Sequence, residues 1–233
     1  MDDALKLQTD VAALAKSEGR KVGTAGHAAA KKYLLERLGS LNLQPYQGES
    51  FELSYQAGTK TFSNLVGVLR GSERHLTPIL IGAHYDSVIS SYCADDNAAA
   101  VAIALLAAEK LKASNPSRDI VIALFDAEEP PYFHSPEMGS TRFYQEQSRD
   151  EGFHVALIMD LAGHDVELPF PGLDATGSSL ANLLFMTGAE SHASLPKVVR
   201  ACLPGPNLPL VASLNRNVGD MSDHHTFRLG GVP

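Results

Sequence analysis

Residues 79–86 read Ile-Leu-Ile-Gly-Ala-His-Tyr-Asp, a short apolar run that ends in polar side chains. The same arrangement returns at residues 119–129, where the apolar run ending at Phe125 is followed by Asp-Ala-Glu-Glu. A short apolar run bounded by polar residues is typical of a buried strand. Residues 97–112, between the two, carry apolar side chains at the spacing of one helix face. Strand, helix and strand in this order indicate an α/β fold.

The rest of the chain extends this alternation in both directions. Toward the C-terminus we expect a helix at residues 139–147, a strand at 155–159, and weaker strands at 183–186 and 208–214 around a helix near 189–201. Toward the N-terminus we expect helices at 4–14 and 26–38, then extended segments at 49–55 and 61–69 joined by Ala57-Gly58 as a hairpin. The predicted fold is a three-layer α/β/α sandwich with a mixed, mostly parallel central sheet and an antiparallel hairpin at its edge.

The composition narrows the function classes. The chain has 233 residues, 44% of them hydrophobic, which is enough for one domain with a substantial core. Its 19 Lys and Arg against 27 Asp and Glu give a formal charge of −8. Since nucleic acids and anionic membrane surfaces would repel such a chain, we expect neither as a partner.

The sequence contains no pattern typical of a membrane span or of an export signal. The longest apolar run, residues 98–108, is far shorter than the roughly 20 residues that cross a bilayer. The first residues lack a basic region followed by an apolar stretch, so we expect no signal peptide here. A cytoplasmic protein and a secreted or periplasmic protein without its leader both remain open. Cys93 and Cys202 lie far apart in sequence, which predicts neither a CxxC metal site nor a disulfide framework.

Polar residues suited to metals or proton transfer follow each of the three best strands. His84-Tyr85-Asp86 ends the first strand, residues 126–129 end the second, and Asp160 ends the third. Asp95-Asp96-Asn97 precedes the apolar helix, and Ser222-Asp223-His224-His225 lies near the C-terminus. Ligands collect at the carboxyl ends of strands in open α/β sheets. We therefore expect these side chains to gather at one edge of the sheet.

Taken singly, these residues have ordinary explanations. Asp96 could cap a helix, Glu128-Glu129 could be a solvated loop, and His84 could be a core histidine. Together they form a set of two imidazoles and three carboxylates without a thiol: His84, Asp96, Glu129, Asp160 and His224. Such a nitrogen and oxygen set suits catalytic zinc. Five ligands exceed the needs of one open zinc site, which favours two metals sharing a bridging carboxylate.

At these residues the sequence resembles the co-catalytic di-zinc aminopeptidase family, whose relatives include glutamate carboxypeptidases and glutaminyl cyclases. The matching motifs run in order through most of the chain: residues 64–67, 82–87, 94–98, 128–129, 159–161 and 222–224. The resemblance implies the zinc-exopeptidase fold, one domain over residues 1–233, and a chain that lacks the family's last strand and helix.

The resemblance also implies a role for each residue. Asp96 would bridge the metals, His84 and Asp160 would complete one metal site, and Glu129 and His224 would complete the other. The general base of the family falls on Glu128. Asp86 matches the carboxylate that orients the ring of His84, a support that imidazole ligands commonly require. The choice of Asp96 over Asp95 rests on the alignment, because spacing cannot separate neighbours.

The implied activity is that of a zinc metallo-aminopeptidase, a hydrolase that removes the N-terminal residue of peptides with a free N-terminus. Two Zn²⁺ ions would lower the pKa of a shared water toward about 7. Glu128 would take its proton and later deliver it to the leaving amine. The preferred N-terminal residue and the oligomeric state are not fixed by the sequence.

Two other functions use the same residues. A single-zinc glutaminyl cyclase would hold its metal with Asp96, Glu129 and His224, but the chain has no tryptophan, which that subgroup leads one to expect around its substrate pocket. A catalytically silent metal-binding domain is the other alternative, although the ligands and base are all present. The loop at residues 130–138 could wall a substrate pocket or be an ordinary surface loop.

Overall fold

The computed structural model describes residues 2–164, 184–188, 190–203, 210–213 and 221–233. The chain divides into two compact units. The first comprises residues 1–163 and 221–232, and the second comprises residues 164–220 and Pro233. The candidate site residues all belong to the first unit, so this unit is described first.

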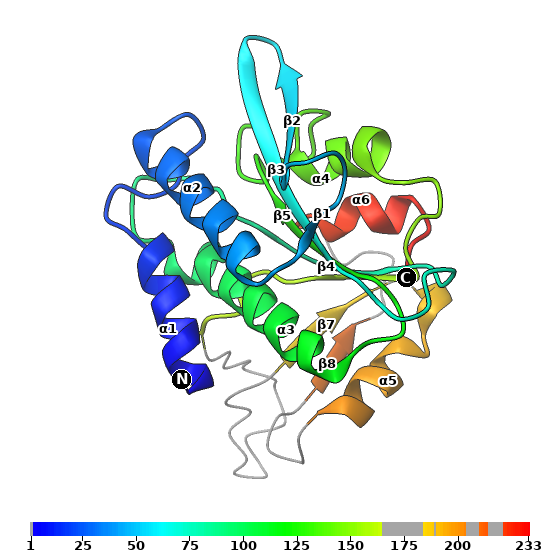
Figure 1. The fold of residues 1–233 in the computed structure, drawn as a ribbon. Helices are drawn as coiled ribbons and strands as arrows, with labels where there is room; N and C mark the ends of the chain where they lie inside the picture. The colour runs from blue at the N-terminus through cyan, green and yellow to red at the C-terminus, as the bar shows by residue number, and fades with distance from the viewer. Residues whose placement is uncertain (1, 165–183, 189, 204–209, 214–220) are drawn as a thin grey trace, which may run out of the picture. The chain divides into compact units, whose positions relative to one another are not determined.

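The first unit is built on a six-stranded mixed sheet (Figure 1). Its strands are β1 (Gln44–Pro45), β2 (Glu52–Ala57), β3 (Lys60–Leu69), β4 (Ile79–His84), β5 (Ile120–Phe125) and β6 (Val155–Ile158). The order is β1-β3-β5-β4-β6, and β2 also pairs with β3. Strands β5, β4 and β6 are parallel, whereas β3 runs antiparallel to β1, β2 and β5. The mixed sheet of an α/β fold is thus confirmed.

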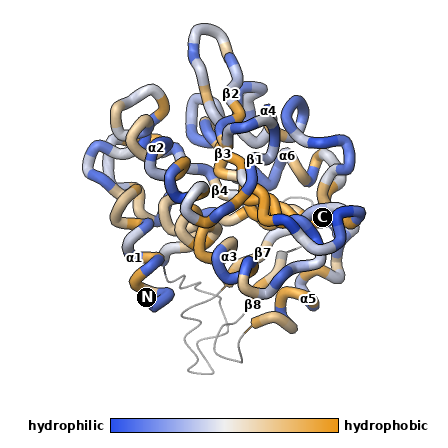
Figure 2. Tube along the Cα trace, viewed as in Figure 1, coloured by the Kyte–Doolittle hydropathy of each residue, from blue (hydrophilic) through white to orange (hydrophobic). Residues whose placement is uncertain are grey.

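The predicted hairpin is the β2–β3 ribbon, which turns at Gly58. Gly58 has a φ of +59°, a left-handed conformation that glycine adopts without a steric penalty. The tip of the hairpin is hydrophilic, while hydrophobic residues gather in the central strands (Figure 2). Because β2 pairs only with β3, the hairpin lies at the edge of the sheet, as the sequence predicts.

Helices cover both faces of this sheet (Figure 1). Side chains alternate between the faces of a strand. In β5, Ile122 and Leu124 belong to one core cluster. The helices α1 (Asp3–Leu14), α2 (Ala25–Ser40) and α3 (Ala100–Ser114) contribute side chains to the same cluster. Val121 and Phe125 belong to the opposite cluster, with Phe143 and Phe227. That cluster lies under α4 (Gly139–Arg142), the π-helical turn η2 (Phe143–Gln147) and α6 (His224–Leu229). Every residue of β5 is apolar and buried, as expected for a strand that is covered on both faces. This is why an apolar run in the sequence predicts the three layers.

The helix predicted at residues 97–112 begins later than expected. The π-helical turn η1 (Ala94–Ala99) comes first, and α3 begins at Ala100. Asp96 and Asn97 have non-helical φ/ψ values of −106°/92° and −133°/33°. Neither η1 nor α3 has a side-chain cap hydrogen bond, so capping does not explain Asp96. Sequence periodicity continues through this segment, but the backbone of Asp96 leaves the helix.

Two short elements of the first unit have no strong sequence signal. Strand β1 has only two residues, and α6 has six. Both are too short to show a period of apolar residues, and tertiary pairing or packing defines them. The ends of the longer predicted elements agree with the structure within a few residues.

The second unit contains a two-stranded parallel sheet of β7 (Leu184–Thr187) and β8 (Leu210–Ser213). Between these strands lie the 3₁₀ turn η4 (Glu190–His192) and α5 (Leu195–Cys202). The predicted strands and helix are confirmed here, although positions 183, 189, 208–209 and 214 of those predictions lie outside the described residues. The guanidinium of Arg200 donates to the carbonyl oxygen of Leu210 at 3.1 Å, which ties α5 to β8.

No helix within the described ranges is both long and apolar enough to cross a membrane. Cys93 and Cys202 are free thiols.

Candidate metal centre

His84 is the last residue of β4, and its side chain is 1% exposed. The parallel register aligns His84 with Phe125 of β5, and Gly82 with Ile158 of β6. The three strands therefore end at the same edge of the sheet, with the segments that follow them in contact. This edge is where the sequence predicts the candidate site residues to meet.

Three carboxylates surround the Nε2 atom of His84. The Oδ1 atom of Asp96 lies 3.2 Å away, and oxygens of Glu128 and Asp160 each lie 3.7 Å away. Two groups of possible metal ligands share this imidazole. One ligand atom from each of His84, Asp96 and Glu129 lies within 4.8 Å of the others, and the same holds for His84, Glu128 and Asp160. The structure thus brings four other predicted side chains close to His84: those of Asp96, Glu128, Glu129 and Asp160.

Asp86 connects His84 to the two glutamates. Its Oδ1 atom lies 3.4 Å from Nδ1 of His84, on the side of the ring opposite the cluster of carboxylates. The backbone N–H groups of Glu128 and Glu129 donate to its Oδ1 and Oδ2 atoms, both at 3.1 Å. The Asp86 carboxylate is fully buried. It therefore fixes the backbone of both glutamates as well as facing the imidazole, a double contact that the sequence did not suggest.

The structure separates Asp95 from Asp96. The Oδ1 atom of Asp95 accepts a hydrogen bond from the backbone N–H of Gly163 at 2.7 Å. Asp96 instead points toward His84, and the peptide bond between Asp96 and Asn97 is cis. The side-chain amide of Asn97 donates to the carbonyl oxygen of Met159 at 3.0 Å. Of the two neighbouring aspartates, Asp96 is the one in position to bind a cation with His84.

The remaining predicted ligand is His224. It is the first residue of α6 and is half-buried, and neither ligand group found among the described residues includes it. Its neighbour Asp223 is fully buried. Burial raises the pKa of Asp223, and the negative charges of Asp86 and Asp160 add to this while His84 opposes it. The sequence contained Asp223 beside the predicted ligand, but no periodic signal marked it as the buried member of the pair.

Asp126 follows β5 directly, next to the candidate glutamates, yet its carboxylate binds residues of neighbouring elements and not the cluster around His84. Its Oδ2 atom accepts from the backbone N–H of Ser63 at 2.8 Å, and its Oδ1 atom lies 2.8 Å from Nε2 of His27. The ring of His27 stacks on that of Tyr85 with centroids 5.2 Å apart. Asp126 thus joins β3, α2 and the segment after β4, and it is absent from both ligand groups.

Burial and crowding make the ionised form of this cluster costly. Burial raises the pKa of Glu129 to about 7, and the charges of Asp96 and Asp86 add to this. Burial likewise raises the pKa of Glu128, which His84 partly offsets. Burial alone would lower the pKa of His84, but the carboxylates of Asp160, Asp86 and Asp96 raise it well above 6.5. Without a cation, these side chains retain protons near neutral pH.

The cluster also leaves buried ligand atoms without hydrogen bonds among the described residues. They are Nε2 of His84, Oε1 of Glu129 and Oδ1 of Asp160. Buried polar atoms are nearly always satisfied, so lone pairs that converge in this way need a partner. One imidazole and several carboxylates are donors that zinc accepts in open catalytic sites. The residues present therefore fit a divalent cation such as zinc.

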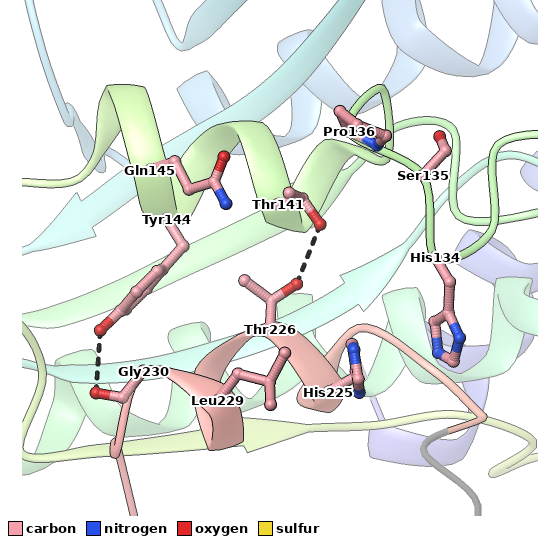
Figure 3. Close-up of a pocket in the computed structure, with 10 residues that line it drawn as sticks. All are labelled: His134, Ser135, Pro136, Thr141, Tyr144, Gln145, His225, Thr226, Leu229 and Gly230. Carbon is pink, nitrogen blue, oxygen red and sulfur yellow. Dashed lines mark hydrogen bonds between the residues drawn. The ribbon is translucent and has the colours of Figure 1, made fainter.

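A cavity of about 430 Å³ opens between the loop after the glutamates and α6 (Figure 3). Its walls carry mostly polar side chains: His134, Ser135, Pro136, Thr141, Tyr144, Gln145, His225, Thr226, Leu229 and Gly230. The rings of His134 and His225 stack with centroids 4.3 Å apart. The hydroxyl of Tyr144 donates to the carbonyl oxygen of Gly230 at 3.1 Å. The loop at residues 130–138 thus lines a cavity on the first unit.

The pKa shifts predict how the stability of the metal-free chain depends on pH. Between its ordinary pKa of 4.5 and about 7, Glu129 is ionised in the unfolded chain but stays protonated in the folded one. The folded state then binds more protons, so the free energy of unfolding falls as pH rises through this range. The raised pKa of His84 acts in the same direction above 6.5. Carboxylates with lowered pKa values, Glu52 and Asp160, have largely ionised in both states before pH 5.

Urea unfolding at pH 5, 6 and 7 with a chelator present checks this prediction. In a second series without the chelator, free zinc at 100 times its dissociation constant should raise the free energy of unfolding at pH 7 by about 2.7 kcal/mol over the metal-free chain. A metal-free chain that becomes more stable from pH 5 to 7 would contradict the assignment of raised pKa values to the cluster.

The fold has counterparts among solved structures. A leucine aminopeptidase precursor from Bacteroides thetaiotaomicron VPI-5482 matches with a TM-score of 0.69 and 16% identity, over 99% of this chain and 82% of that one. Porphyromonas gingivalis glutaminyl cyclase matches with a TM-score of 0.72 and 18% identity, over 99% and 81%. A Zn-dependent exopeptidase from Parabacteroides distasonis ATCC 8503 matches with a TM-score of 0.66 and 17% identity, over 99% and 82%. At these identities the likeness establishes the fold.

The sequence itself identifies the family. The chain is 30% identical over 172 residues to the uncharacterized protein YfbL of Escherichia coli (strain K12). The aligned region covers 66% of this chain and 53% of YfbL. The chain thus spans about half the length of that relative. The model of peptidase family M28 matches residues 64–233, a range that contains every candidate ligand. The chain belongs to peptidase family M28.

Proposed function

We propose that this chain is a zinc-dependent aminopeptidase that hydrolyses the N-terminal bond of peptides with two zinc ions and Glu128 as general base. One observation carries the proposal. Buried ligand atoms of His84, Glu129 and Asp160 converge without hydrogen bonds, and a buried glutamate lies 3.7 Å from the same imidazole. Membership of a peptidase family and the likeness to an aminopeptidase precursor support it.

The ligand atoms divide between two metal positions in this proposal. Asp96 would be the ligand shared by both, His84 and Asp160 would complete one position, and Glu129 and His224 would complete the other. The geometry around His84 supports four of these five ligands. The assignment of His224 as a ligand rests on the resemblance to the aminopeptidase family alone. When bound, zinc supplies Lewis-acid polarisation of the scissile carbonyl and a lower pKa for the attacking water.

Glu128 moves the proton in this reaction. Its carboxylate takes a proton from the water whose oxygen forms the new bond to the carbonyl carbon. The same proton then goes to the nitrogen as the carbon–nitrogen bond breaks, so a carboxylic acid and an amine leave. In the metal-free chain burial raises the pKa of Glu128 to about 9, and the positive charge of a bound cation would lower it toward the range that a general base needs. Asp86 keeps this side chain in position through the backbone N–H of Glu128.

Hydrolysis of aminoacyl-anilides by the full chain, with zinc or with a chelator, tests the proposal. Zinc should support release of the anilide, the chelator should abolish it, and N-acetylated substrates should not react. A metal count by mass spectrometry should give two zinc ions per chain.

Each alternative function gives a different result in the same assays. Hydrolysis that survives full metal removal, or cleavage of the acetylated substrates, contradicts the aminopeptidase. One zinc with pyroglutamate formation from N-terminal glutamine identifies a glutaminyl cyclase instead. Zinc binding without turnover of any substrate identifies a silent metal-binding domain.

A further inference from the structure

Arg20 is a buried cation outside the residues that match the family model. It lies between α1 and α2, and it is 1% exposed, among the largest fully buried side chains of the described chain. Charged side chains are almost never buried to this extent unless they are paired. Arg20 makes no ion pair among the described residues, so its partners must be found elsewhere.

Backbone carbonyl oxygens take up its hydrogen bonds. The guanidinium donates to the carbonyls of Leu14, Tyr85, Tyr92, Cys93 and Asp96, at 3.2, 2.8, 3.3, 3.0 and 3.3 Å. The backbone of Arg20 is bound as well, since its N–H donates to the hydroxyl of Ser87 at 2.8 Å and its carbonyl accepts from the N–H of Ser87 at 3.3 Å. Almost all of these contacts lie on one segment, residues 85–96.

That segment connects two proposed metal ligands. Tyr85 follows His84 directly, and Asp96 is itself the proposed bridging ligand. Nε of Arg20 binds the first end of the segment, and Nη2 binds the last. Because a guanidinium is planar and its donors have fixed directions, it sets the distance between the two ends.

The turn before Arg20 is shaped to lie against the same segment. Gly19 has a φ of +67°, and a Cβ atom there would come within 2.4 Å of the carbonyl oxygen of Ile89 and 2.8 Å of the backbone nitrogen of Ser91. Only a residue without a side chain allows this approach. The close packing of Gly19 and the reach of Arg20 thus act on one segment from one side.

We propose that Arg20 is a positioning residue for the metal centre, which holds residues 85–96 so that His84 and Asp96 face a single cation. This inference rests on the proposed metal centre. It assigns to the N-terminal region, outside residues 64–233, a part in building the site.

Zinc affinity, measured by competition with a chromophoric chelator on the full chain, tests the inference. Arg20→Gln keeps a polar side chain but loses the guanidinium donors that bind both ends of the segment. It should weaken zinc binding by about 10- to 100-fold, the effect typical of residues that orient metal ligands. The absorption bands of bound Co²⁺ should shift as well, because the ligand geometry changes. Arg20→Lys keeps the charge with one donor group and should show a smaller loss of affinity.

Arg37→Gln is the matched control. The guanidinium of Arg37 binds the carboxylate of Asp10 through two hydrogen bonds of 2.7 and 3.1 Å, which joins α2 to α1 without contact to residues 85–96. This variant should lower the unfolding temperature but leave zinc affinity and the Co²⁺ spectrum unchanged.

The outcomes separate this inference from the proposed function. A wild-type chain that binds no zinc contradicts the proposed function. If the wild type binds zinc and a folded Arg20→Gln chain binds it equally well, with the same Co²⁺ spectrum, the inference about Arg20 is wrong. Should Arg20→Gln fail to fold, Arg20→Lys decides, and a folded Arg20→Lys chain with wild-type affinity and spectrum overturns it.

Discussion

Replacing Glu128 by glutamine is expected to lower kcat by about 10²- to 10⁴-fold, the usual contribution of a positioned acid or base. Glutamine has almost the same shape, so the hydrogen bond from the backbone N–H of residue 128 to Asp86 should persist. The amide cannot accept the proton from water or return it to the leaving nitrogen. Steady-state hydrolysis of an aminoacyl-anilide measures the loss, and mass spectrometry of the purified variant measures its zinc content.

The zinc content decides how this result is interpreted. Glu128→Gln should retain the metal, because Glu128 is proposed as the base and not as a ligand. Glu36→Gln makes the same chemical change at an exposed position on α2 and should leave both measurements unchanged. A Glu128→Gln chain that keeps substantial activity with metal bound contradicts the general-base assignment. Loss of zinc in that variant would instead make Glu128 a ligand, in line with its place beside His84 and Asp160.

Replacing Asp96 by asparagine is expected to weaken zinc binding by more than about 100-fold, beyond the range for residues that only orient ligands. The carboxylate of Asp96 lies 3.2 Å from Nε2 of His84 and is the proposed bridge. An amide removes the negative charge that would offset the cations, and its nitrogen is no ligand. Hydrolysis should fall to the level of the chelated wild type. Chelator competition and the metal count provide the measurements.

Asp95→Asn is the control for that variant at the adjacent position. The carboxylate of Asp95 accepts from the backbone N–H of Gly163, a bond that an amide oxygen can also accept. Asp95→Asn should therefore retain zinc and most of the activity. The opposite pattern, with zinc lost in Asp95→Asn and kept in Asp96→Asn, would exchange the roles of the two residues.

The fold could be predicted from the sequence where its physical cause is local. Strands β4 and β5 are apolar runs because they are buried on both faces, and α1, α2 and α3 carry apolar residues at helical spacing. The positions of polar residues after each strand also follow from sequence, because parallel strands end at one edge of a sheet. These features place His84, Glu128, Glu129 and Asp160 in the same region.

Other features depend on contacts between residues far apart in the chain. Asp95 and Asp96 have the same chemistry and adjacent positions, and only the path of the backbone turns one toward His84 and the other toward Gly163. Asp126 and Glu128 both follow β5, yet Asp126 binds Ser63 and His27 while Glu128 faces the cluster. No spacing rule separates such neighbours.

The sequence by itself determined the layers of this protein and the chemical types gathered at the end of its central strands, because burial and strand direction impose regular patterns on neighbouring residues. Only the tertiary structure decided which side chains share one imidazole, how Asp86 holds both glutamates, and that Arg20 binds both ends of the segment from residue 85 to residue 96. The physical reason is that hydrogen bonds and ligand contacts act over about 3 Å in space, whereas the residues that make them lie up to 76 positions apart in the chain.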